Sequence, residues 1–113
     1  MVVTCLQLNW GVRHPIVSLP DDVVAWVTRH FSNGDVPAAL ATLGSAVDHT
    51  GELVSQRLVR CAAVGSRGNL DQLRHLVAEL RTDWRDVIMG SEYEMRDGKS
   101  VRVHDFNSPI ADA

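Results

Sequence analysis

Long apolar runs and an excess of one kind of charge are both missing from this sequence. No stretch approaches the roughly 18 consecutive apolar residues of a membrane-spanning helix. The chain has 11 basic and 14 acidic residues, for a net charge of −3, whereas a general nucleic-acid binder needs a strong basic field to neutralise phosphates. We therefore expect neither a membrane protein nor a nucleic-acid-binding protein.

Cysteine is also scarce. Cys5 and Cys61 are the only two cysteines, and they form no CxxC pair. So small a count does not require a disulfide framework, and Cys61 falls on an apolar helical face. The first residues lack the basic region of a signal peptide. These features favour a cytoplasmic protein in which Cys61 is reduced and buried.

No catalytic or metal-binding motif is present either. Gly65 and Gly68 lack the surrounding pattern of a nucleotide-binding loop, and the five histidines follow no metal-ligand spacing. Asp83 and Asp86 lie one helical turn apart and could share a site as paired carboxylates. However, the first turn of a helix also favours acids at both positions. We predict no catalytic residue, no metal ligand and no cofactor.

Helix signals, in contrast, are abundant. With 45% apolar and 22% charged residues, the chain suits one helical domain over 1–113. Capping residues followed by apolar stripes predict helices over 18–31, 35–47, 51–64, 69–81 and 83 to about 94, with caps at Ser18, Asp35, Thr50, Asn69 and Asp83. The predicted fold class is all-α: a compact bundle of four to five short helices packed as antiparallel hairpins, with short extended segments at the termini.

The first extended segment is an arm over 1–17, where apolar residues alternate and Pro15 discourages a helix. The other end leaves two interpretations open. "RDGKSVRVHDF" contains the Asp-Gly signal of a β-hairpin, but a two-residue turn would set Tyr93 and Met95 opposite polar residues. A three-residue loop would remove that conflict. We favour a helix to about Glu94, followed by a turn and an extended tail over 95–113.

The third and fourth predicted helices carry matching apolar faces. We predict that four residues are buried together where these helices pack: Leu58, Leu73, Val77 and Leu80.

The last predicted helix has two apolar sides. Trp84, Ile88 and Met95 share one side, and Met89 and Tyr93 lie nearly opposite. A terminal surface helix needs only one apolar face. The helix is therefore either sandwiched within the protein or in contact with a partner, and a Met–Tyr pair has the adaptable, aromatic character of an interface centre.

Charged and aromatic residues extend this predicted interface. Arg85 and Glu92 flank the Met–Tyr pair, and Glu92 is placed to pair with Arg96 one turn later. Trp26 lies off the apolar stripe of the first helix, one turn from His30. Either residues 6–16 cover Trp26, or Trp26 and His30 form part of a binding surface.

Arginines supply almost all of the basic charge. Arg57 and Arg60 share one side of the third predicted helix, and Arg74, Arg81 and Arg85 follow. These side chains form either an anion-binding patch or solvated faces on which each arginine has an acidic neighbour, such as Asp71 for Arg74 and Asp86 for Arg85. The second interpretation is favoured.

The segment "RLVRCAAVGSRGNLDQLRHLVAELRTDWRDVIMGSEYE" (57–94) resembles part of a group of small uncharacterised bacterial proteins. Those proteins have an Arg-rich helix, a Gly-bounded turn, a Leu-striped helix and an aromatic-Arg-Asp-Val-Ile run ending in Glu-Tyr-Glu. Trp84 stands where Tyr is more usual. The resemblance implies a bacterial, cytoplasmic origin, and the group brings no assigned activity.

Two hypotheses for function follow. The first is a non-enzymatic protein-binding module, an adaptor or neutraliser of another bacterial protein, which binds that partner or a second copy of itself in a homodimer. Its predicted binding residues are Trp26, His30, Arg57, Arg60, Arg85, Met89, Glu92 and Tyr93. The alternative is a small enzyme or small-anion-binding protein that uses Asp83 and Asp86 with nearby arginines.

Overall fold

The computed structural model describes residues 19–110, which form a compact, mostly helical unit with one small β-hairpin. The elements in chain order are α2 (Asp21–His30), α3 (Val36–Gly44), α4 (Gln56–Gly65), α5 (Leu70–Leu80), α6 (Trp84–Glu92), β1 (Tyr93–Arg96) and β2 (Lys99–Arg102). The fold is therefore helical as predicted, but it is not purely all-α. The predicted arm over 1–17, the cap at Ser18 and Cys5 lie outside the described residues.

Several predicted helix starts agree with the structure. Asn69 caps α5, because its side-chain oxygen accepts a hydrogen bond from the backbone N–H of Gln72 at 2.8 Å. Asp35 and Asp83 occupy the N-cap positions of α3 and α6, although neither side chain makes a capping hydrogen bond.

The predicted cap at Thr50 is wrong, because α4 begins five residues later. Ser55 is its N-cap and accepts a hydrogen bond from the N–H of Leu58. Residues 48–52 form a turn instead, in which the Asp48 carboxylate accepts hydrogen bonds from the N–H and hydroxyl of Thr50. Gly51 completes that turn with a φ of 88°.

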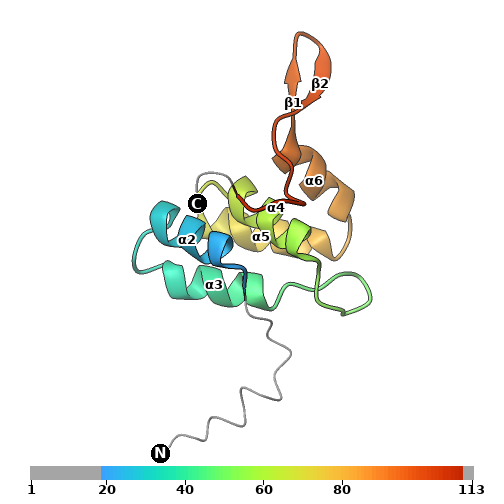
Figure 1. Cartoon of the computed structure of the whole chain (residues 1–113). Helices are drawn as coiled ribbons and strands as arrows, with labels where there is room; N and C mark the ends of the chain where they lie inside the picture. Colours follow the sequence, from blue (N-terminus) through green and yellow to red (C-terminus); the bar gives the residue numbers. More distant parts are fainter. Residues whose placement is uncertain (1–18, 111–113) are drawn as a thin grey trace, which may run out of the picture.

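The favoured interpretation of the chain end is also wrong, since α6 stops at Glu92 and a hairpin follows. Strands β1 and β2 pair antiparallel with Tyr93 opposite Arg102 and Met95 opposite Ser100. Asp97 and Gly98 close the hairpin with φ values of 50° and 76°, as a primed two-residue turn requires. In this register the apolar residues of the two strands do not share one face. This does not destabilise the hairpin, because it projects away from the helices and has no buried face (Figure 1).

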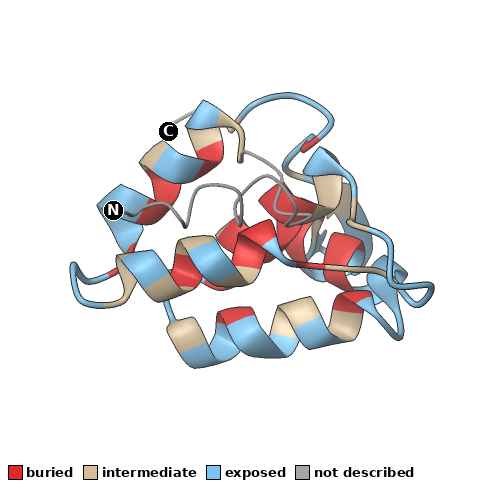
Figure 2. Ribbon diagram, turned by 90° about the horizontal axis from the view of Figure 1, so that it is seen from below, coloured by how far each residue is buried: buried red, intermediate tan, exposed pale blue. Residues whose placement is uncertain are grey.

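Helix α4 occupies the centre of the fold and contacts α2, α3, α5 and α6. Buried residues lie on the inward faces of the helices, and exposed residues lie on the outward faces (Figure 2). The predicted core is confirmed for Leu73 and Leu80, which are fully buried. Leu58 and Val77 are only partly buried and pack against that core.

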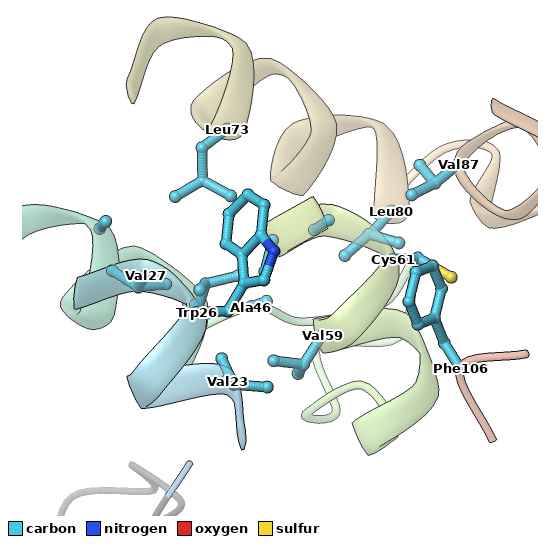
Figure 3. Close-up of a cluster of buried hydrophobic side chains, with 14 of the residues drawn as sticks. Val23, Trp26, Val27, Ala46, Val59, Cys61, Leu73, Leu80, Val87 and Phe106 are labelled. Carbon is cyan, nitrogen blue, oxygen red and sulfur yellow. The ribbon is translucent and has the colours of Figure 1, made fainter. Parts of the chain in front are cut away.

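The segment after β2 returns to the body of the fold. Phe106 is 3% exposed and belongs to the hydrophobic core, where Figure 3 shows its ring beside Cys61. Phe106 also stacks on the ring of His104, with centroids 5.1 Å apart. The predicted extended tail is therefore a packed segment over residues 103–110.

We expect Leu73→Ala to lower the free energy of unfolding by about 2–5 kcal/mol, because it loses buried apolar surface and leaves a cavity. Chemical denaturation followed by circular dichroism measures this change. The control is His75→Ala, an exposed position on the same helix, which should change stability by less than about 0.5 kcal/mol. A Leu73→Ala variant as stable as the parent would show that α5 packs through another face.

Candidate functional site

The Glu92 carboxylate at the end of α6 is fully buried. Arg57 donates to it twice, from Nε to Oε2 at 3.0 Å and from Nη2 to Oε1 at 2.8 Å. Arg102 donates to Oε1 at 2.9 Å, and the N–H of Phe106 donates to Oε2 at 3.2 Å. One carboxylate thus connects α4, α6, β2 and the returning C-terminal segment.

Electrostatics keep this carboxylate ionised. Burial alone would raise the pKa of Glu92, because a charged group is poorly solvated inside the protein. The hydrogen bonds from Arg57, from the N–H of Phe106 and from Arg102 outweigh that effect and hold the pKa at about 2. Such a group carries a permanent negative charge at neutral pH and is not a proton donor there.

This finding corrects the prediction that Glu92 flanks an exposed interface and pairs with Arg96. Because the helix ends at Glu92, Arg96 lies on strand β1 rather than one helical turn further on. Arg96 pairs with Glu94 instead. Glu92 pairs instead with Arg57, 35 residues earlier, and with Arg102 on the second strand of the hairpin, so the i,i+4 spacing did not identify its partners.

A second buried ion pair lies between α2 and α4. Arg60 donates from Nε to Asp22 Oδ2 at 2.9 Å and from Nη1 to the carbonyl of Phe106 at 3.3 Å. The N–H of Ile110 donates to the same Asp22 oxygen at 3.0 Å. Burial raises the pKa of Asp22, but the hydrogen bonds from Arg60 and from the N–H of Ile110, together with the positive charge of Arg60, outweigh burial and lower the pKa below its usual value.

Arg57 and Arg60 each have an acidic partner, as the favoured interpretation expected, but the partners are carboxylates from other elements of the fold rather than neighbours on a solvated helix face. Each is bound to an internal carboxylate, and the side chain of Arg60 is only 7% exposed. Arg74 pairs with Asp71 at 3.8 Å as predicted. Arg85 lies over the ring of Trp84 instead of pairing with an acid, with its guanidinium carbon 5.2 Å from the ring centroid.

Cys61 is fully buried as a free thiol, as the sequence predicted. Its Sγ lies 3.7 Å from Glu92 Oε2 and donates to it. Burial and the neighbouring negative charge raise the pKa of Cys61 to about 12. The thiol is therefore protonated at neutral pH and unsuited to act as a nucleophile.

The predicted alternative site is exposed. Asp83 and Asp86 both lie on the surface at the start of α6. Within residues 19–110, no group of three or more His, Cys, Asp or Glu side chains is placed to hold a metal ion.

Trp26 belongs to the core and is 7% exposed. The exposed ring of His30 stacks on it, with centroids 4.2 Å apart, and His30 Nδ1 lies 3.0 Å from the carbonyl of Trp26. Both residues border a hollow of about 270 Å³ whose other wall is the returning segment around Phe106 and Ile110. The predicted cover, residues 6–16, lies outside the described residues.

The other predicted interface residues lie on the surface but not on one helix. Met89 is 49% exposed on α6, whereas Tyr93 is half-buried in β1 beneath the guanidinium of Arg102. The prediction that Met89 and Tyr93 lie one helical turn apart fails, because α6 ends between them. Trp84 is itself exposed rather than packed, so the helix does present apolar side chains to solvent.

An apolar groove lies beside Trp84, between the start of α6, the start of α4 and the turn that precedes α4. Its volume is about 330 Å³. The apolar lining consists of Leu53, Val54, Leu58, Trp84 and Ile88, and the polar rim consists of Asp48, His49, Ser55 and Arg57. Trp84 is 40% exposed there, and an exposed tryptophan on an apolar groove is typical of a contact surface.

Sequence reasoning missed the Leu53–Val54 wall of this groove, because it placed these residues in a helix from 51. The signal that could have located the wall is "DHTG" at 48–51. An Asp followed two residues later by a hydroxyl residue and then Gly is typical of a turn. Recognising that turn would have moved the helix start to Ser55 and left Leu53 and Val54 in a connecting segment.

Comparisons with protein-family models, with curated proteins and with solved structures found no match to this chain. None of the helices in the described part of the chain is long and apolar enough to cross a membrane. The candidate site therefore depends on the geometry of the groove and of the charged cluster behind it.

We expect Glu92→Gln to destabilise the fold by about 3 kcal/mol at pH 7, because two arginines lose their buried counter-charge while remaining partly hydrated. The folded-state pKa of about 2 lies below the ordinary value of 4.5. The stabilisation is therefore complete above pH 4.5 and is lost as the pH falls through 2. Denaturant titrations at several pH values measure it.

The matched control for Glu92 is Glu52→Gln, an exposed carboxylate that makes no side-chain hydrogen bond among the described residues. Its stability should follow the parent curve at every pH. Parallel curves for Glu92→Gln and the parent between pH 2 and 5 would contradict the buried ion-pair assignment.

A second prediction concerns the thiol of Cys61. In a Cys5→Ser variant we expect Cys61 to react with a disulfide reagent only as the chain unfolds, because the folded thiol is buried and its pKa is about 12. The rate of reaction followed against denaturant concentration measures this. Rapid reaction of the folded protein at pH 8 would show that Cys61 is accessible.

Proposed function

We propose that this chain is a non-enzymatic protein-binding module, an adaptor or neutraliser of another bacterial protein, which binds an apolar segment of its partner in the groove beside Trp84. The observation that supports this most is the groove itself. Its five apolar side chains come from three separate parts of the chain, and Trp84 at its edge remains 40% exposed. An isolated apolar side chain on a surface is ordinary, but a lined groove with an exposed Trp resembles the centre of an interface.

Arg85 offers a contact for an acidic side chain of the partner beside Trp84, whereas Asp48 makes another part of the groove rim acidic. Arg85 lies over the ring of Trp84, and no acidic side chain pairs with it among the described residues. A partner carboxylate beside Trp84 would supply the missing counter-charge, while an apolar side chain fills the space between Leu58 and Ile88. Complementary charges at an interface raise the specificity and the association rate more than they raise the affinity.

The state of the buried carboxylates supports binding rather than catalysis. A general acid or base works best with a pKa near neutral pH, whereas the pKa values of Glu92 and Asp22 are both lowered by internal hydrogen bonds. These groups hold elements of the fold together, and Glu92 is linked to the groove through its bonds to Arg57. Arg57 reaches the groove rim, but its Nε and Nη2 atoms are bound to Glu92.

The alternative hypothesis, a small enzyme or anion binder, has less support. It requires Asp83 and Asp86 to act with Arg57, Arg60 or Arg85, and only Arg85 has no internal acidic partner among the described residues. Asp83 and Asp86 are exposed to water at the start of α6, and neither is enclosed in a site with a basic side chain.

Peptides selected on the immobilised chain from a displayed random library test the binding proposal. We expect the selected peptides to combine apolar and acidic residues, and Trp84→Ala to weaken their binding at least about tenfold, as for a central interface residue. Fluorescence anisotropy of a labelled selected peptide gives the dissociation constant.

Met89→Ala is the matched control, because Met89 is exposed on the same helix but does not line the groove. It should change the dissociation constant by less than about twofold. If Met89→Ala weakens binding and Trp84→Ala does not, the contact surface is the opposite side of α6. If no selected peptide distinguishes Trp84→Ala from the parent, the groove is not the binding site.

A further inference from the structure

The hairpin of β1 and β2 has two open edges. It projects away from the helices, and no third strand joins its sheet among residues 19–110 (Figure 1). Met95 in β1 is 69% exposed, the highest value among the exposed large apolar residues of the described chain. A two-stranded hairpin is marginally stable alone, and an open strand edge can pair with another strand.

One backbone hydrogen bond determines which backbone groups of the hairpin point outward. The N–H of Val103 donates to the carbonyl of Glu92 at 2.7 Å, so these two residues continue the strand register as a hydrogen-bonded pair. Hydrogen-bonded pairs alternate along an antiparallel ladder, so Glu94 and Arg96 also bond inward to β2. The N–H and C=O groups of Tyr93 and Met95 therefore point to the open edge of β1.

The open edge of β1 is complementary to itself. An antiparallel pairing centred on Met95 sets Met95 opposite Met95 of the second copy, and the two residues exchange both backbone hydrogen bonds. In the same register, Glu94 of each copy lies opposite Arg96 of the other. Opposite charges across two strands stabilise the pairing, and the Glu94–Arg96 ion pair within each copy would face the same pair of the other copy with opposite charges aligned.

The open edge of β2 lacks this complementarity. It contains Lys99 and Arg102 and no acidic residue. Pairing two copies of β2 would bring only basic side chains together, and an edge lysine is a known protection against such pairing. The two edges therefore differ in a way that favours a closed pair of molecules over an open chain.

From these features we propose that a second copy of this chain binds along β1, forming a four-stranded antiparallel sheet across a two-fold axis centred on Met95. Each copy presents the same strand to the other, so the interface is isologous and closes after two molecules. A contact between two four-residue strands is smaller than the about 1,200–2,000 Å² of a stable complex. The dimer is therefore weak and reversible, and it forms as concentration rises.

Sedimentation velocity of the full chain over a range of concentrations tests this inference. We expect a monomer–dimer equilibrium, and Met95→Pro should weaken it at least about tenfold, because proline removes the central N–H donor from both copies. Ser100→Pro is the matched control. It removes the outward N–H of the β2 edge at the position opposite Met95, and it should leave the equilibrium unchanged.

Charge changes provide a second, independent measurement. Arg96→Glu leaves four acidic side chains at the junction and should abolish self-association. It also removes the Glu94–Arg96 pair within each copy, but it places an acid opposite Lys99 in the hairpin. The double variant Glu94→Arg with Arg96→Glu restores opposite charges across the two-fold axis and should restore the dimer. Circular dichroism confirms that each variant keeps its fold.

Three results would overturn the inference: a parent chain that stays monomeric at millimolar concentration, equal effects of Met95→Pro and Ser100→Pro, or no recovery in the double charge variant. Trp84→Ala separates this inference from the proposed function. It should leave the monomer–dimer equilibrium unchanged while it weakens peptide binding, because Trp84 lies at the other end of α6 from the hairpin.

Discussion

The buried carboxylate of Glu92 is the interaction on which the arrangement of the C-terminal half depends. It receives hydrogen bonds from α4, from β2 and from the segment that returns after the hairpin. Its own backbone carbonyl accepts from Val103, which aligns the start of that returning segment. Without a negative charge at this point, Arg57 and Arg102 would lie close together with no counter-charge between them, and the N–H of Phe106 would have a weaker acceptor.

The sequence predicted the features that depend on neighbouring residues and missed those that depend on distant ones. Asn69 caps a helix whose stripe buries Leu73 and Leu80, and all of that information lies within a dozen residues. The partner of Glu92 could not be predicted in the same way. Arg96 lay one predicted turn away, whereas Arg57 lies 35 residues earlier in the chain, so only the folded topology could decide between them.

The hairpin was missed for a related reason. A strand register is usually tested by asking whether the apolar residues of both strands share one face, because one face of a sheet is normally buried. Here Met95 and Ser100 lie opposite each other on a hairpin with no buried face. The turn residues Asp97 and Gly98 then determine the structure, since both adopt the positive φ that a primed turn requires. The Asp-Gly turn signal predicted the hairpin correctly, whereas the distribution of apolar residues on its two faces argued against it.

Helix α6 connects the groove beside Trp84 to the hairpin, the two proposed contact surfaces. Its first residue, Trp84, borders the groove, and its last residue, Glu92, anchors the hairpin. A helix of nine residues spans about 13 Å, so a partner in the groove and a second copy on β1 would contact separate ends. Because Glu92 bonds to both Arg57 and Arg102, the hairpin has a fixed direction relative to α4. Dimerisation through β1 would therefore hold two grooves in a defined geometry, and the buried charge cluster would act as the rigid connection between them.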